Sequence, residues 1–186
     1  MVLPCAGRPA ACLWATVENS MTISNRQLTD AFLSPQMQCY FERKLAPLCS
    51  EEVGIRIEET LKFLNIATFC HGSIPVTKDI DDVWHYWILE TREYAHLCAS
   101  LQGRQYIHHS SKVYLECGGI GSQDSRNNLE EDVAMLGTYV LNYGPFEPDR
   151  VKYWLLAAHL VDKCGWSVAQ LNDWLTSAAI VPLAPA

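Results

Sequence analysis

Residues 79–98 read Asp-Ile-Asp-Asp-Val-Trp-His-Tyr-Trp-Ile-Leu-Glu-Thr-Arg-Glu-Tyr-Ala-His-Leu-Cys. Apolar residues recur here every three or four positions, which predicts an amphipathic helix to about residue 101, ended by Gly103. Asp81 lies one helical turn before His85, so its carboxylate can accept a hydrogen bond from the imidazole. The stretch therefore predicts a core helix that also carries a candidate site.

The rest of the chain also has a helical pattern. Apolar positions at helical spacing, bounded by capping residues, prolines and glycines, predict helices at residues 24–34, 36–46, 50–68, 125–143, 148–164 and 167–178. No stretch has the apolar–polar alternation of a half-buried strand. We therefore predict a single all-α domain over residues 21–180, a helical bundle of about seven helices. Residues 1–20 are expected to be a flexible N-terminal extension and residues 181–186 a frayed tail.

Composition and charge narrow the class of protein. Hydrophobic residues make up 49% and charged residues 19% of the chain, as in globular proteins. The formal net charge of −7 disfavours nucleic-acid binding and docking on anionic membranes. No stretch approaches the roughly 20 apolar residues of a membrane span. The start of the chain does not match a secretory signal, since Pro4, Arg8 and Pro9 interrupt it. We expect a cytoplasmic protein with no nucleic-acid and no membrane partner.

The eight cysteines contain no Cys-x-x-Cys pair, which argues against a zinc ribbon. Free thiols are expected in a reducing compartment. Cys39, Cys98 and Cys164 fall among apolar residues, which predicts that they are buried.

A second polar element follows the central stretch at Ile107-His108-His109. Adjacent histidines cannot both face one direction, so at most one is expected to meet His85. Two imidazoles and a carboxylate can hold non-haem iron, and three imidazoles can hold zinc with one open position. We take Asp81, His85, His108 and His109 as candidate catalytic residues and the three histidines as candidate metal ligands. The alternative is that Asp81 favours the helix start and that the histidines are core or solvated groups.

Three further residues are candidates for substrate binding. Trp84 lies on the apolar face with Trp87, where core packing is the simplest interpretation, but it could also wall an apolar pocket. Arg92 and Arg104 could anchor an anionic substrate, although solvated charges are the usual role of such residues.

One motif resembles a known family. It runs Asp81-x-x-Trp84-His85-x-x-Ile88-Leu89-x-Thr91-x-x-Tyr94, followed by Cys98, Gly103 and Ile107-His108-His109. Over about residues 55–112 the chain is similar to small bacterial proteins that resemble the N-terminal part of plant glycine-rich-domain proteins. The resemblance implies that Asp81, Trp84, His85 and the His pair act together. It supplies no substrate, and the plant proteins' glycine-rich run is missing here.

The leading hypothesis is a small cytoplasmic helical enzyme that acts on a small organic molecule. Its step would be a biosynthetic tailoring oxidation or cyclisation, with a divalent metal such as iron or zinc as the candidate cofactor. The alternative is a non-catalytic helical protein-binding or adaptor module that docks a partner through the face of Trp84 and Trp87 and the apolar last helices. A purely structural role of the histidines is a third hypothesis. A homo-oligomer or a protein partner is compatible with each of them.

Overall fold

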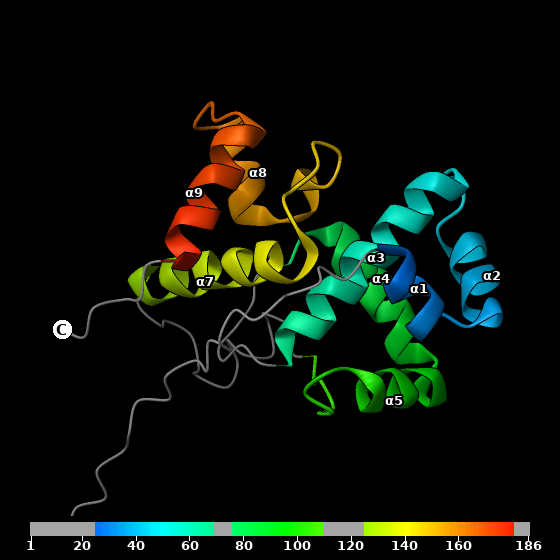
Figure 1. Cartoon of the computed structure of the whole chain (residues 1–186). Helices are drawn as coiled ribbons and strands as arrows, with labels where there is room; N and C mark the ends of the chain where they lie inside the picture. The colour runs from blue at the N-terminus through cyan, green and yellow to red at the C-terminus, as the bar shows by residue number, and fades with distance from the viewer. Residues whose placement is uncertain (1–24, 69–75, 110–124, 181–186) are drawn as a thin grey trace, which may run out of the picture.

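The computed structural model describes residues 25–68, 76–109 and 125–180, which form helices and contain no strand (Figure 1). The helices are α1 (Asn25–Phe32), α2 (Pro35–Lys44), α3 (Ser50–Ala67), α4 (Lys78–Leu89), α5 (Thr91–Ser100), α7 (Ser125–Tyr143), the 3-10 helix η1 (Val151–Tyr153), α8 (Leu155–Asp162) and α9 (Val168–Ile180). The prediction of a single all-α domain is confirmed. The predicted N-terminal extension and C-terminal tail lie outside the described residues.

Helix α3 lies between two groups of helices. It contacts α1, α2 and α4 on one side and α7 on the other. Figure 1 shows α7, α8 and α9 grouped on one side of the molecule and α1, α2 and α5 on the other. The sequence of α3 suits this position, because every residue from Glu59 to Ile66 is buried, including the charged Glu59 and Lys62. A helix that is buried all round must give each of these polar groups a partner inside the protein.

The apolar face of α4 is part of the core, as its spacing predicts. The side chains of Trp84 and Trp87 are 7% and 1% exposed. Trp87 packs edge-on against Phe41 of α2, with ring centroids 5.0 Å apart, and Trp84 against Phe63 of α3 at 5.3 Å. Aromatic pairs of this geometry are worth more than the apolar area they bury. These contacts fix the rotation of α4 and thereby direct Asp81 and His85 away from the core.

The prediction of one continuous helix over residues 79–101 is wrong. The helix ends at Leu89 and α5 begins at Thr91, because Glu90 adopts φ −90° and ψ 67°, outside the helical region. The amide N–H of Glu90 bonds to the carbonyl of Trp87 and closes the last turn of α4. The turn lets α5 bury Tyr94 and Leu97 while α4 buries its own tryptophans. Apolar spacing continues through the break, so the sequence pattern does not reveal it.

Two further predictions need correction. The expected helix at residues 148–164 is the 3-10 helix η1 followed by α8, because Trp154 has an extended backbone that interrupts the helix. Of the cysteines predicted to be buried, Cys98 is buried, whereas Cys39 and Cys164 are exposed on the outward faces of their segments. The four described cysteines are free thiols: Cys39, Cys49, Cys98 and Cys164.

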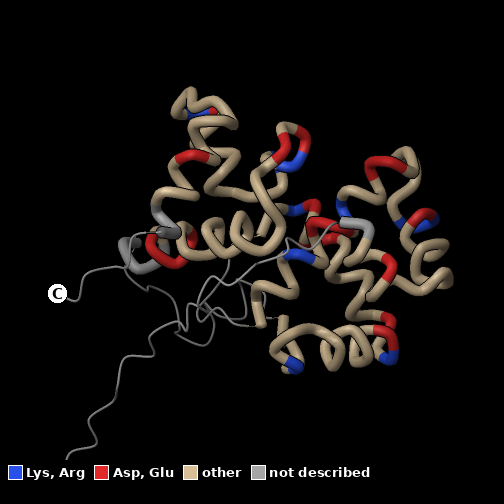
Figure 2. The backbone as a smooth tube through the Cα atoms, viewed as in Figure 1, with Lys and Arg blue, Asp and Glu red and all other residues tan. Residues whose placement is uncertain are grey.

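Charged residues are spread over the described helices. Figure 2 shows Lys and Arg as short, separate segments with Asp and Glu between them. Within the described residues, no helix is long and apolar enough to cross a membrane.

Candidate functional site

Three of the predicted residues come together at the start of α4. Asp81 and His85 lie one turn apart on the helix, and His109 approaches them from the irregular segment that follows α5. One ligand atom of each residue lies within 4.8 Å of the others, so this group could hold a metal ion. We call Asp81, His85 and His109 the His/Asp cluster.

Asp81 is the centre of the His/Asp cluster. Its Oδ1 lies 3.1 Å from Nε2 of His109, and its Oδ2 lies 3.4 Å from Nδ1 of His85. The other acids of this helix turn have cationic partners, since Asp79 pairs with Arg56 at 2.7 Å and Asp82 with Lys78 at 2.6 Å. Asp81 is therefore the acid of α4 whose carboxylate contacts imidazoles.

The hydrogen bonds fix which nitrogens are protonated. Nδ1 of His85 lies 2.7 Å from the backbone carbonyl oxygen of Asp81. A carbonyl oxygen only accepts, so Nδ1 carries the proton and Nε2 of His85 is the nitrogen available to a metal or a substrate proton. An ionised carboxylate also only accepts, so Nε2 of His109 donates to Asp81. A metal bound by His109 through this nitrogen would replace that proton.

Ring contacts hold the two imidazoles next to each other. The centroids of the His85 and His109 rings are 4.3 Å apart, and the His109 ring lies 4.7 Å from Trp84. Exposure decreases from His85 at 49% through Asp81 at 33% to His109 at 21%. The cluster is thus open to solvent on the His85 side and rests on the core through Trp84.

His108 lies outside the His/Asp cluster, so the predicted set of three histidine ligands needs correction. It is exposed, and its ring packs against Tyr106 with centroids 5.0 Å apart. Of the two histidines, His109 faces α4, since its ring contacts those of Trp84 and His85. The expectation that at most one of the pair reaches His85 agrees with this geometry, and Asp81 takes the third position.

The predicted substrate-binding residues are not gathered around the cluster. Trp84 is buried, and its indole N–H donates to the hydroxyl of Tyr94 at 2.9 Å. Arg92 is exposed in the first turn of α5, and Arg104 is exposed with a left-handed φ of 48°. Among the described residues, neither guanidinium forms an ion pair or hydrogen bond with the cluster. Only Trp84 contacts it, through the ring of His109.

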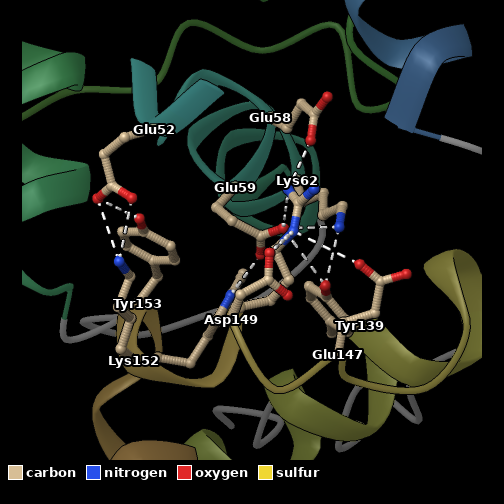
Figure 3. Close-up of polar contacts among 11 residues, drawn as sticks. Glu52, Glu58, Glu59, Lys62, Tyr139, Glu147, Asp149, Lys152 and Tyr153 are labelled. Atoms are coloured by element: carbon tan, nitrogen blue, oxygen red, sulfur yellow. Dashed lines mark hydrogen bonds and ion pairs between the residues drawn. The ribbon is translucent and has the colours of Figure 1, made fainter. Parts of the chain in front are cut away.

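A second group of polar residues, which sequence reasoning missed, is buried between α3 and the segment after α7 (Figure 3). Glu59 is fully buried and accepts hydrogen bonds from Nζ of Lys62 at 2.7 Å and from the indole of Trp154 at 2.8 Å. Lys62 also donates to the hydroxyl of Tyr139 at 2.8 Å. Arg150 pairs with Glu58 at 2.5 Å and lies 3.4 Å from Glu59. We call Glu59, Lys62, Tyr139, Arg150 and Trp154 the buried network.

The buried network joins α3 to the C-terminal helices. Burial, together with the nearby charge of Glu59, raises the pKa of the Tyr139 hydroxyl well above its usual value, so this group stays protonated. Beyond the network, Arg150 also lies 3.6 Å from Glu147 and 3.5 Å from Asp149. Every interaction is made inside the protein, which indicates a structural connection between the two groups of helices rather than a site for a ligand.

Comparison of the chain with protein-family models, curated proteins and solved structures finds no match. The resemblance to the glycine-rich-domain proteins therefore stays a prediction, and the function has to be argued from the geometry of the site.

Proposed function

We propose that this protein is a small metal-dependent enzyme that acts on a small organic molecule through the His/Asp cluster. The observation that supports the proposal is the convergence of the Asp81, His85 and His109 ligand atoms within 4.8 Å. Two imidazoles and one carboxylate are the ligands of non-haem iron(II) sites, which keep positions open for other ligands. Zinc accepts the same donors. A metal bound there would polarise a substrate oxygen or activate water.

Two of the three ligand atoms already have the spacing that a metal requires. Ligand atoms about 2.1 Å from a metal lie roughly 3 Å from one another when they occupy neighbouring positions. Oδ1 of Asp81 and Nε2 of His109 are already 3.1 Å apart. The third ligand would be Nε2 of His85, whose side chain is 49% exposed and keeps its Nδ1 hydrogen bond to the carbonyl of Asp81 when Nε2 binds.

The surroundings also suit a metal ligand set. A ligating histidine commonly donates its other ring N–H to a carbonyl or carboxylate, which fixes the ring and raises its basicity. His85 already donates Nδ1–H to the carbonyl of Asp81. One helix turn would therefore supply two ligands, the carboxylate of Asp81 and the imidazole of His85. The carbonyl of Asp81 would also hold the His85 ring in place.

A metal-free acid–base site is the second candidate. The hydrogen bond of 3.1 Å from His109 to Asp81 is the pairing that orients a catalytic imidazole in many enzymes. In this case the Asp81–His109 pair would transfer a proton to or from the substrate, and His85 would be a neighbouring polar group. Metal analysis separates the two candidates.

The adaptor alternative required Trp84 and Trp87 on an open surface. Both are in the core, with exposures of 7% and 1%, so they offer no docking face. The geometry therefore favours a site at the His/Asp cluster over docking through the tryptophans.

The test is metal binding by the whole chain. Titration of metal-free protein with iron(II) under anaerobic conditions, and separately with zinc, should show one ion bound per chain. Asp81→Asn and His109→Ala should abolish this binding. His108→Ala is the matched control, because it removes the neighbouring imidazole, which lies outside the cluster.

Two results would contradict the metal-dependent proposal. One is a wild-type protein that binds neither ion. The other is a His108→Ala variant that loses as much affinity as His109→Ala, since the ligand would then not be the residue that faces α4. If the wild type binds neither iron(II) nor zinc while the His109→Ala variant loses activity on a substrate, the acid–base candidate replaces the metal-dependent one.

A further inference from the structure

We propose that Tyr94 positions His109 in the His/Asp cluster, by holding the backbone two residues before it. Tyr94 touches neither Asp81 nor His85, and sequence reasoning assigned it no role. The inference rests on the proposed function, because it assigns a residue that tunes the same metal site.

His109 needs such a support because it comes from a segment without regular secondary structure. Residues 103–109 follow α5 outside any helix or strand, and the amides of Gly103 and Arg104 bond to Thr68 and Leu101 only at the start of the segment. Asp81 and His85 are held by α4, whereas the approach of His109 depends on what the segment contacts. A ligand that must lie within a few tenths of an ångström of its place requires a rigid support.

The hydroxyl of Tyr94 provides that support through two hydrogen bonds. It donates to the carbonyl oxygen of Ile107 at 2.6 Å and accepts from the indole N–H of Trp84 at 2.9 Å. Tyr94 is completely buried, and burial raises the pKa of its hydroxyl, so the donor stays protonated. The carbonyl of Ile107 is thereby tied to α4 through Tyr94 and Trp84.

Ring contacts reinforce the same support. The ring of Tyr106 lies edge-on to Tyr94, with centroids 5.3 Å apart, and the ring of His109 lies edge-on to Trp84 at 4.7 Å. Tyr94 and Trp84 therefore contact the segment on both sides of Ile107. The turn at Glu90 makes this possible, because it brings Tyr94 of α5 next to Trp84 of α4.

The test compares two Tyr→Phe variants. Tyr94→Phe removes the hydroxyl that holds Ile107. Tyr143→Phe is the matched control, because its hydroxyl accepts a hydrogen bond of 2.8 Å from Asn65, away from the cluster. Zinc affinity is measured by competition with a chromophoric chelator, and unfolding is followed by circular dichroism on the same samples.

We expect Tyr94→Phe to raise the zinc dissociation constant by about 10- to 100-fold, the usual effect of losing a residue that orients a metal ligand. Tyr143→Phe should leave the constant within about twofold while lowering the melting temperature, as expected for the loss of a partly buried hydrogen bond. The proposal would be overturned if Tyr94→Phe bound zinc as tightly as Tyr143→Phe and the wild type do. It would also be overturned if both variants lost zinc affinity equally, because the loss would then reflect reduced stability alone.

Two additions keep the proposal testable. If Tyr94→Phe does not fold, Tyr106→Ala removes the ring that packs on Tyr94 from a side chain that is half exposed. It should raise the zinc dissociation constant roughly twofold to tenfold, the range for one aromatic pair, and an unchanged constant would refute the role of this support. If the wild type binds neither zinc nor iron(II), the metal-dependent function fails. The NMR signals of the His109 ring protons in metal-free protein then test the positioning role of Tyr94. Their chemical shifts must change in Tyr94→Phe and stay unchanged in Tyr143→Phe.

Discussion

Replacing the buried carboxylate of Glu59 by an amide should strongly destabilise the protein. Glu59 is completely buried, and Lys62, whose Nζ lies 2.7 Å from Oε1, is 3% exposed. At this distance and an effective dielectric constant of about 20, the attraction between the charges is roughly 6 kcal/mol. Glu59→Gln removes most of this attraction but leaves the ammonium group buried. We expect the free energy of unfolding to fall by about 3–5 kcal/mol, the usual cost of breaking a buried pair.

The assay is urea unfolding followed by circular dichroism, with Lys62→Met and the double variant completing a cycle. The single amide oxygen of Gln can accept from Trp154 or from Lys62 but not from both, so the change removes the charge together with one of these two hydrogen bonds. The double variant should be more stable than the sum of the single losses predicts, because replacing both partners by neutral groups of similar size is often close to neutral.

The control for this cycle is Lys78→Met. Nζ of Lys78 also lies 2.6 Å from a carboxylate, that of Asp82, but the Lys78 side chain is 81% exposed. Its loss should not change stability beyond experimental error, because solvent screens the pair. The reasoning would be refuted if Glu59→Gln had no larger effect than Lys78→Met, or if the losses at Glu59 and Lys62 simply added.

Four further outcomes are expected. Gly103→Ala should lower the free energy of unfolding by about 1–3 kcal/mol in thermal or urea unfolding, because a Cβ would lie 2.7 Å from the backbone oxygen of Thr68. Gly54→Ala in α3 should instead raise the free energy of unfolding by about 0.5–1 kcal/mol, because nothing lies within 4 Å of the added atom. Burial raises the pKa of Glu52, but hydrogen bonds from Tyr153, Lys152 and Arg56 outweigh it and hold that pKa below its usual value. The stability advantage of wild type over Glu52→Gln should therefore be complete at neutral pH and disappear as the pH falls through the lowered pKa, which unfolding at several pH values will show. Zinc affinity of the His/Asp cluster should fall as the pH is lowered, because protons compete for the imidazoles, and titrations at two pH values will test it.

The helices were predictable because their signals are local. Ser34 and Pro35 at the start of α2 illustrate this, since Ser34 accepts a hydrogen bond from the amide of Met37 at 3.2 Å and caps the helix. The turn at Glu90 is different, because no glycine or proline marks it. It is set by packing, which places Tyr94 of α5 against Trp84 of α4, and such contacts between helices leave no local pattern.

Part of the candidate site follows from the sequence, and part of it depends on the fold. The relation of Asp81 to His85 follows from helix geometry, so the sequence predicts it. The choice of His109 over His108 depends on how residues 103–109 lie on Tyr94 and Trp84, which only the folded chain defines. The adjacency of the two histidines predicts that at most one reaches His85, but it does not select which one.

The buried network shows that helical spacing alone does not tell a buried ion pair from an exposed one. Glu59 and Lys62 lie three residues apart on a helix, a spacing that is also common for exposed ion pairs. Leu61 and Phe63 on either side of Lys62 are apolar, which favours burial, but the partners that satisfy the pair are far away in sequence. Tyr139 lies 77 residues after Lys62, and Trp154 lies 95 residues after Glu59. The pair is therefore stable only in the folded protein with α7 and η1 in place, so its loss should loosen the contact between the two groups of helices before it affects the local helix.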